Sequence, residues 1–186
     1  MSRIPALDPA AATGRARELL ETVKQSLGVT PNLMRVMAQE PAVLDAYLQL
    51  GQALGKGSFN PSTRHAIALA TAGANACGYC ASAHAAISIG LKVPQDEIAS
   101  RLAGRSSDPK LEALLKFSRQ VVATRGEVSG ADIAAVRSAG ASDGEIVETV
   151  ANVAANLLTN YINHVAQTVI DFPEVDPSAH RVSALG

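Results

Sequence analysis

Two cysteines and a histidine form the most reactive cluster in this 186-residue sequence. Cys77, Cys80 and His84 lie at positions i, i+3 and i+7, which one face of a helix can present together. A thiolate attacks peroxides and disulfides, and a neighbouring thiol condenses with the oxidised sulfur to form a disulfide. An imidazole one turn away can accept or donate the proton. The spacing therefore favours dithiol redox chemistry.

The residues before the cysteines predict where this helix begins. Gly73 and Asn75 make a plausible turn, which places Cys77 near the amino end of the helix. The positive end of the helix dipole and the free backbone N–H groups favour thiolate over thiol there. We therefore expect at least one ionised sulfur at neutral pH.

Two other uses of a Cys-x-x-Cys pair are disfavoured by the surrounding sequence. A haem-attachment site needs histidine directly after the second cysteine, and Ala81 occupies that position. Thioredoxin-type chemistry normally accompanies a βαβ pattern, and no convincing strand pattern appears. Two small buried side chains beside a surface histidine would be the purely structural interpretation, which the spacing disfavours.

Zinc binding remains the main alternative from the residues alone. Cys77, Cys80 and His84 would supply three ligands, and His65 or His164 would have to complete the tetrahedron. Structural zinc sites usually pair two such clusters, so this interpretation ranks below redox chemistry. A non-enzymatic zinc-binding or assembly module is therefore the alternative function.

His65 has a geometric relation to His84. The midpoint between the two positions falls at residues 74–75, where the turn is expected. If the flanking helices fold back as an antiparallel hairpin, the two imidazoles lie at similar depth and can form a hydrogen bond. That bond would fix the tautomer of His84 and tune its basicity. The structural alternative is an exposed histidine in the first turn of its helix.

The elements that must position these residues are all expected to be helical. Helical periodicity runs along nearly the whole chain, with starts at residues such as Asn60–Pro61 and Asp108–Pro109. We predict one all-α domain over residues 1–186, with a core from about 10 to 172 and an irregular tail. Besides the cysteine-bearing helix, the predicted helical segments are 9–28, 30–41, 41–55, 60–76, 94–102, 108–126, 129–140 and 142–172.

Composition limits the classes of partner. Hydrophobic residues make up 47% and aromatic residues 3%, which indicates a folded, aliphatic, alanine-rich core. A net charge of −1 and few aromatics give no reason to expect nucleic-acid binding. We find no signal-peptide or membrane-span pattern and expect a cytoplasmic protein. In that reducing compartment, a close cysteine pair is catalytic or metal-binding rather than a structural disulfide.

A stripe of polar residues marks the last predicted helix. Asn152, Asn156, Asn160 and His164 follow one another at i+4 spacing on an otherwise apolar segment. Asn160 or His164 could line the thiol pocket. We favour a structural role, in which the stripe satisfies buried polar groups or sets helix register across a subunit contact.

The motif and its surroundings resemble a known family. The stretch "NPSTRHAIALATAGANACGYCASAHAAISIG", with its Cys-x-Tyr-Cys-x-x-x-His signature, is similar to alkylhydroperoxidase D-like (AhpD-like) proteins of the carboxymuconolactone decarboxylase superfamily. The later segment 140–173 also resembles peroxidase-related members. The resemblance implies an all-α helical bundle with the Cys-x-x-Cys at the N-terminus of a central helix, assembled as trimers or hexamers.

The resemblance also implies roles for the site residues. Cys80 would attack a hydroperoxide, Cys77 would resolve the oxidised sulfur, and His84 would act as acid and base. Tyr79 would occupy a position where relatives carry a residue of the proton relay. A dithiol such as dihydrolipoamide would restore the thiols, with no bound cofactor. The decarboxylase branch generally lacks the cysteine pair, so a decarboxylase with incidental thiols ranks third.

One position departs from the family pattern. Twelve residues before the first cysteine the family places a glutamate that orients the histidine, and His65 stands there in this sequence. A neutral imidazole cannot supply a fixed negative charge, so it would stabilise a protonated His84 less than a carboxylate does. The resemblance then implies either a modified relay or a role centred on disulfide reduction.

Overall fold

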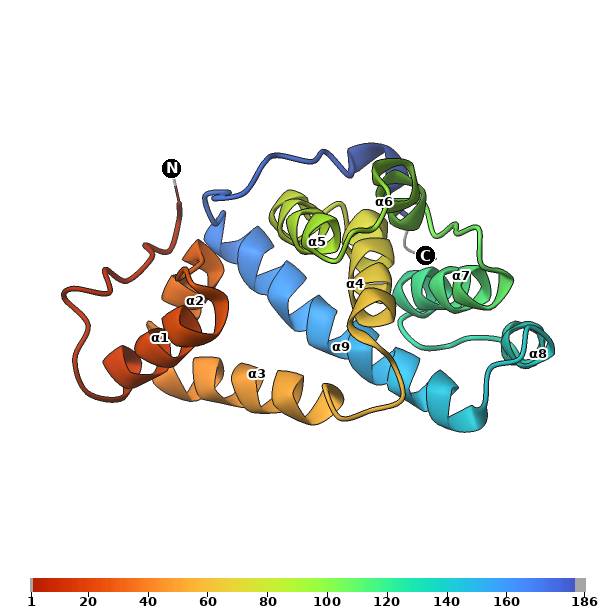
Figure 1. Cartoon of the computed structure of the whole chain (residues 1–186), viewed down its shortest axis with the longest axis horizontal. Helices are drawn as coiled ribbons and strands as arrows, with labels where there is room; N and C mark the ends of the chain where they lie inside the picture. Colours follow the sequence, from red (N-terminus) through yellow and green to blue (C-terminus); the bar gives the residue numbers. More distant parts are fainter. Residues whose placement is uncertain (1, 183–186) are drawn as a thin grey trace.

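The computed structural model describes residues 2–182, and the regular secondary structure in that range is all helical (Figure 1). Residue 1 and residues 183–186, the last part of the expected irregular tail, lie outside the described residues. The all-α prediction is confirmed. The elements are α1 (Gly14–Leu27), α2 (Asn32–Met37), α3 (Pro41–Leu54), α4 (Pro61–Asn75), α5 (Gly78–Gly90), α6 (Gln95–Leu102), α7 (Pro109–Thr124), α8 (Gly130–Ser138), α9 (Asp143–Ala166) and the 3₁₀ turn η1 (Ser178–His180).

Most helix starts agree with the sequence because the capping side chains do what their types predict. Asn60 accepts a hydrogen bond from the Thr63 N–H at 2.9 Å, with Pro61 in the first turn of α4. Ser142 and Glu145 form a reciprocal capping box at the start of α9. Local chemistry is therefore sufficient to fix these boundaries.

Two predicted boundaries are wrong. The first helix begins at Gly14 rather than near residue 9. The last helix ends at Ala166 rather than near residue 172, because Gln167 adopts a left-handed conformation with φ 50°. The carbonyl of Ala166 accepts hydrogen bonds from the backbone N–H groups of Arg3 and Ile4. The N-terminal segment thus binds the carboxyl end of α9, a long-range contact that no local pattern indicates.

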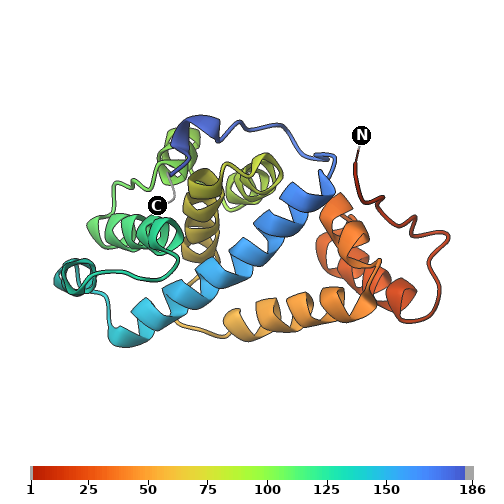
Figure 2. The same cartoon turned by 180° about the vertical axis from the view of Figure 1, so that it is seen from behind.

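Helix α4 lies between two hydrophobic clusters and is buried on nearly every side. Leu69 and Ala72 belong to a cluster shared with α1, α2 and α5. Ala66 and Ile67 belong to a second cluster shared with α7 and α9. Figures 1 and 2 show α4 beside α5, with α9 crossing both and α1 to α3 at the other end of the molecule. The alanine-rich composition follows, because small side chains let these helices approach closely.

A sharp turn joins α4 to α5. Ala76 has φ 53°, in the left-handed region, and the Cys77 N–H donates to the carbonyl of Ala72 at 2.9 Å. Helix α4, which contains Gly73, therefore continues to Asn75. The turn lies one to two residues later in the chain than the sequence predicted. The turn delivers Cys77 to the amino end of α5, as expected.

The tail after α9 crosses the top of α5 and α6 as a largely irregular strap (Figure 1). The Val175 N–H donates to the Ser82 hydroxyl at 2.9 Å, and the Val182 N–H donates to the Ala74 carbonyl at 3.0 Å. The strap thus holds both α4 and α5 near the turn that carries the cysteines. No helix in the described range combines the length and hydropathy that a bilayer crossing requires.

Replacement of Gly73 by alanine should destabilise the protein. An added Cβ would overlap the backbone carbonyl of Leu102 where α4 meets α6. We expect Gly73→Ala to lower the free energy of unfolding by about 2 kcal/mol, as for other overpacked sites, measured by urea denaturation. Gly51→Ala is the matched control, because its Cβ would meet nothing within 4 Å. It should be neutral or stabilising by up to about 1 kcal/mol. Equal stability of the two variants would contradict the close approach of α4 and α6.

Candidate active site

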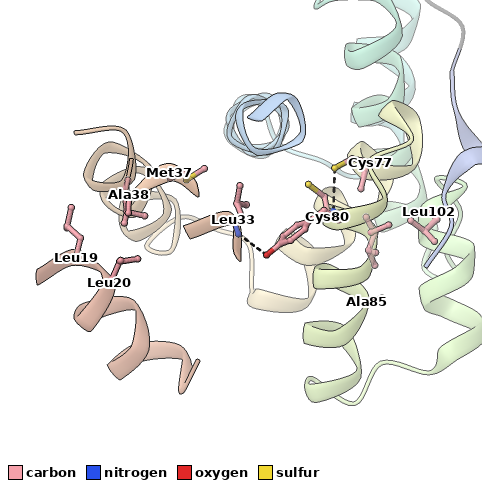
Figure 3. Packing of buried hydrophobic residues seen from close by; sticks show 14 of the residues in the cluster. Leu19, Leu20, Leu33, Met37, Ala38, Cys77, Cys80, Ala85 and Leu102 are labelled. Carbon is pink, nitrogen blue, oxygen red and sulfur yellow. Dashed lines mark hydrogen bonds between the residues drawn. The ribbon is translucent and has the colours of Figure 1, made fainter. Parts of the chain in front are cut away.

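The two cysteines adjoin one another in the first turn of α5. Cys77 is the N-cap residue, and its sulfur accepts a hydrogen bond from the Cys80 backbone N–H at 3.4 Å. Both thiols are free, with exposed fractions of 1% for Cys77 and 3% for Cys80. Figure 3 shows both sulfur atoms on the side of α5 that faces α9. The two thiols are therefore placed to form a disulfide within one helical turn.

Helix α9 supplies polar groups to the Cys80 sulfur. The Asn163 side-chain amide donates to Cys80 Sγ at 3.3 Å. Burial alone would raise the pKa of Cys80, but the polar side chains beside it, Cys77, Asn163, Thr159 and Asn160, outweigh burial and lower the pKa. The thiolate is the form these donors stabilise, because a charged acceptor binds N–H and O–H groups more strongly than a thiol does.

The two thiols have opposite pKa shifts. The hydrogen bond that Cys77 donates to the Cys80 sulfur raises the pKa of Cys77, and burial raises it further. The sequence predicted at least one ionised sulfur at the amino end of this helix, where both cysteines lie. The opposite pKa shifts favour Cys80 as that sulfur, the cysteine that the family resemblance also gives as the nucleophile.

Cys80 lies in the wall of a mainly apolar cavity of about 310 Å³. The Cys77 side chain is not among the cavity's lining residues and lies behind Cys80. A small molecule can therefore reach one sulfur and not the other. The rest of the wall comes from α1 to α3, α5, α9 and the tail: Leu27, Val29, Pro31, Leu33, Met34, Tyr47, Tyr79, Ala83, His84, Ala86, Ile87, Thr159 and Phe172.

His65 and His84 are in contact, as the sequence predicted. Their Nδ1 atoms lie 3.0 Å apart, and their ring centroids 5.2 Å. Burial, with a smaller effect from Arg64, lowers the pKa of His65 to about 4. Burial, followed by His65, lowers the pKa of His84 to about 3, although a hydrogen bond with Asn156 opposes this. Both imidazoles are therefore neutral at pH 7, and one Nδ1 donates its proton to the other.

A second cavity lies on the other side of His84. It has a volume of about 190 Å³, and its wall carries Arg64, His65, Asn152 and Asn156. His84 and Tyr47 line both cavities, so their side chains separate the apolar space beside Cys80 from this polar one. Within residues 2–182 no hydrogen bond joins His84 to Cys80 directly; the sulfur is bonded by α9 instead.

Tyr79 makes a contact between helices that the sequence did not predict. Its hydroxyl oxygen accepts a hydrogen bond from the Leu33 N–H at 3.0 Å and so ties α5 to α2 (Figure 3). Its ring packs edge-on against Phe172, with centroids 5.7 Å apart. Burial raises the pKa of Tyr79. The ring lines the apolar cavity while the hydroxyl bonds α2.

The polar stripe of α9 divides into two halves. Asn152 and Asn156 donate to the carbonyls of Glu148 and Asn152, one turn back in the same helix, which is the structural role that we favoured. Asn160 accepts a hydrogen bond from the Asn75 side chain at 3.0 Å and lies beside Cys80, whose pKa it helps to lower. Neither Asn160 nor His164 lines the cavity beside Cys80, which the functional option required.

The structure does not assemble the predicted zinc ligands. Among residues 2–182, no three histidine, cysteine, aspartate or glutamate side chains lie close enough together to share a metal ion. His84 is directed to His65, as described above, and the Cys80 sulfur to amide donors. The hydrogen-bond donors around the Cys80 sulfur suit a thiolate anion, and they do not suit a bound metal cation.

The sequence did not predict three residues of the site. Thr159 and Asn163 lie on α9, each next to a member of the polar stripe, and Tyr47 lies on α3. The positions of Asn163 and Cys80 are 83 residues apart, so no local spacing relates them. The sequence signal that could have identified them is the presence of polar residues on an otherwise apolar helix. Thr159 and Asn163 share this feature with the residues of the i+4 series.

The fold and the buried dithiol together define an AhpD-like class of helical proteins, and the comparisons with known proteins agree. Residues 41–123 match the model of the carboxymuconolactone decarboxylase family. The match covers α3 to α7, including both cysteines and both histidines of the site. No curated protein sequence matches the chain significantly.

Solved structures extend the likeness to nearly the whole chain. A peroxidase-related protein with an alkylhydroperoxidase AhpD core, from Ralstonia eutropha JMP134, is 29% identical with a TM-score of 0.80, over 91% of this chain and 92% of that one. A peroxidase-related protein from Silicibacter sp. TM1040 is 20% identical, with a TM-score of 0.77 over 98% and 97%. The debrominase Bmp8, solved with 2,3,4-tribromopyrrole, is 19% identical, with a TM-score of 0.77 over 97% and 96%. The resemblance to AhpD-like, peroxidase-related proteins of this family is therefore confirmed.

Removal of the Asn163 donor should make Cys80 less reactive. In Asn163→Leu the sulfur loses one charge-assisted hydrogen bond, and the pKa of Cys80 rises. We expect alkylation of Cys80 by iodoacetamide at pH 7 to slow about tenfold, for a bond worth about 1.5 kcal/mol. The midpoint of the rate–pH profile should move to higher pH. Asn152→Leu, which removes an amide that bonds only the α9 backbone, should keep the wild-type rate. Equal rates for both variants would show that α9 does not stabilise the thiolate.

The histidine pair should make stability depend on pH. Both folded pKa values lie below the ordinary value of 6.5, so the unfolded chain binds more protons as the pH falls from about 6.5 towards 4. The free energy of unfolding should therefore decrease across that window, by on the order of 2 kcal/mol at pH 5 after allowance for solvent screening. Urea denaturation at pH 7.5 and 5 measures this. The double variant His65→Gln, His84→Gln should lose most of the dependence, and His180→Gln in the tail should retain it.

Proposed function

We propose that this protein is a thiol-dependent oxidoreductase that reduces organic hydroperoxides through a Cys80–Cys77 dithiol–disulfide cycle. The observation that carries the proposal is the single sulfur in the wall of the apolar cavity, which accepts a hydrogen bond from Asn163 and whose pKa the surrounding polar groups lower. The peroxidase-related relatives support a role of this kind.

In the first step the Cys80 thiolate attacks the nearer oxygen of ROOH. The S–O bond forms as the O–O bond breaks, and the departing alkoxide takes up a proton to become ROH. The products are Cys80 sulfenic acid and an alcohol, so the peroxide gains two electrons from the sulfur. Desolvation in the apolar cavity strengthens the thiolate as a nucleophile.

In the second step the Cys77 thiol condenses with the sulfenic acid. The S–S bond forms, and the sulfenic oxygen leaves as water with the thiol proton. A dithiol of the lipoyl type then reduces this disulfide by exchange, which returns both thiols and leaves an oxidised dithiol. The neighbouring Cys80 and burial raise the pKa of Cys77, so Cys77 gives up its proton as it attacks, to the oxygen that leaves as water.

The histidine pair provides a proton route that involves no charged imidazole. His84 accepts a proton at one ring nitrogen while it gives one up at the other, and its 3.0 Å partner His65 does the same. The polar cavity supplies the proton on one side, and the cavity beside Cys80 receives it on the other. A relay through neutral rings fits the low pKa values of both histidines, because neither ring holds an extra proton at pH 7.

The cavity favours a bulky apolar substrate over hydrogen peroxide. Its walls are leucine, valine, methionine, isoleucine and aromatic side chains, and few polar groups project into it. Such a surface gains free energy by excluding water from an alkyl or aryl group and gains little from hydrogen peroxide. We therefore expect alkyl and aryl hydroperoxides as the preferred class.

A second candidate reaction uses the same cavity and dithiol. An apolar cavity beside a thiolate also suits a halogenated aromatic ring, and the debrominase Bmp8 shares this fold. Reductive debromination would convert ArBr and two thiols into ArH, bromide, a proton and a disulfide. Hydroperoxide reduction ranks first because the relative with the higher identity is peroxidase-related.

The test is consumption of cumene hydroperoxide by the reduced protein in stopped flow, with mass spectrometry of the product. Wild type should lose two thiols and form an intramolecular disulfide. Cys77→Ser should stop at a sulfenic acid that dimedone traps, and Cys80→Ser should react on the order of 10³-fold more slowly. Thiol content unchanged by stoichiometric hydroperoxide would reject the proposal. Release of bromide from 2,3,4-tribromopyrrole without hydroperoxide turnover would favour the second candidate.

A further inference from the structure

The outer face of α9 is an apolar seam that no other described element covers. In Figure 2 no other helix passes in front of α9. The larger exposed side chains have exposed fractions from 39% to 70%, and Ala154 is exposed between them. The seam consists of Val147, Val150, Ala154, Leu158, Tyr161 and Val165, and Val169 continues it just beyond the helix.

The seam is a continuous stripe and carries no charge. Steps of three and four residues keep its members on one side of a helix with 3.6 residues per turn, over a length of about 27 Å from Val147 to Val165. Glu148 and His164 are the only acidic or basic residues between Val147 and Val165. The Glu148 carboxylate accepts hydrogen bonds from the N–H groups of Ser58 and Phe59, at 2.7 and 3.1 Å, on another side of α9.

The seam is complementary to itself when two copies of the helix run antiparallel. Around a two-fold axis next to Leu158, between residues 157 and 158, Ala154 of one copy faces Tyr161 of the other, so the smallest member meets the largest. Val150 likewise faces Val165, and the two Leu158 side chains meet across the axis, offset by one residue. A closed two-fold contact requires this reciprocity, in which each residue meets its partner twice. Antiparallel pairing also places opposite ends of the helix dipoles together.

The exposed area is of the size that a subunit contact needs. At these exposed fractions the seam leaves on the order of 500 Å² of apolar surface in water, at the upper end for a monomer. A stable interface covers about 800 Å² per partner, so the seam would form the greater part of one. A charge-free stripe of this length is also typical of the centre of homodimer contacts rather than of transient ones.

We propose that α9 pairs antiparallel with α9 of a second copy of this chain, about a two-fold axis next to Leu158. The contact rests on the outer face of the helix and does not depend on the proposed thiol chemistry. It refines the expected homo-oligomer: a two-fold contact allows a dimer or a hexamer and excludes a simple trimer.

A charge exchange across the predicted pair Val150–Val165 tests both the surface and the register. Sedimentation of wild type should show an even-numbered oligomer. Val165→Lys should raise its dissociation constant at least a hundredfold. Addition of Val150→Glu should restore association in low salt, because each new carboxylate then faces an ammonium group of the other copy. Val150→Lys with Val165→Lys should stay dissociated. A monomeric or trimeric wild type, or no rescue by the exchange, would overturn the proposal.

Cross-linking at the axis gives a second readout that does not depend on dissociation. In a Cys77→Ser, Cys80→Ser background, Leu158→Cys should form a disulfide between copies under mild oxidation, since the two copies of this residue meet across the axis. Ile89→Cys, on α5 with an exposed fraction of 59%, is the matched control and should remain reduced at the same concentration. Equal cross-linking of both variants, or of neither, would count against the two-fold axis. Because this background lacks the reactive thiols, the result is separate from the test of peroxide reduction.

Discussion

Stabilisation of a negative charge on one buried sulfur is the constraint on which the rest of this structure depends. A thiolate with 3% exposure is unstable in an apolar interior unless hydrogen-bond donors replace water around it. The Asn163 amide on α9 donates to the sulfur at 3.3 Å, and the neighbouring Cys77, Thr159 and Asn160 also help to lower the pKa of Cys80. Helices α5 and α9 must therefore meet in one register. The small residues of α4, above all Gly73 against α6, and the strap over α5 hold them there.

The same hydrogen bonds distinguish two chemically identical thiols before any substrate arrives. Cys77 donates its proton to the Cys80 sulfur, which raises one pKa and lowers the other. The ionised sulfur is also the one that lines the cavity. Accessibility and charge thus both favour Cys80 as the nucleophile and Cys77 as the resolving thiol. The two roles do not depend on how far each cysteine lies from the end of the helix.

Sequence reasoning succeeded where structure is set by neighbours along the chain. It predicted the helix starts at Asn60 and Asp108, the dithiol at the start of a helix, and the contact of His65 with His84 across a turn. It misjudged the end of α9, which the N-terminal segment binds at Ala166, and it did not predict that Asn163 bonds Cys80. Both contacts join residues more than 80 positions apart. Such contacts are set by tertiary packing, which periodicity and spacing do not encode.

Helix α9 departs from the usual amphipathic pattern: asparagine and threonine side chains lie on its buried face beside Ile146 and Val153, and an apolar seam of valine, leucine and tyrosine side chains faces water. The inward polar face follows from the buried thiolate, which needs donors that apolar residues lack. The outward apolar face is unfavourable for an isolated monomer, since each buried methylene group is worth about 0.8 kcal/mol. Pairing with a second copy would remove that cost and would also fix α9 in place. The contact between subunits and the charge on Cys80 would then be supported by opposite faces of one helix.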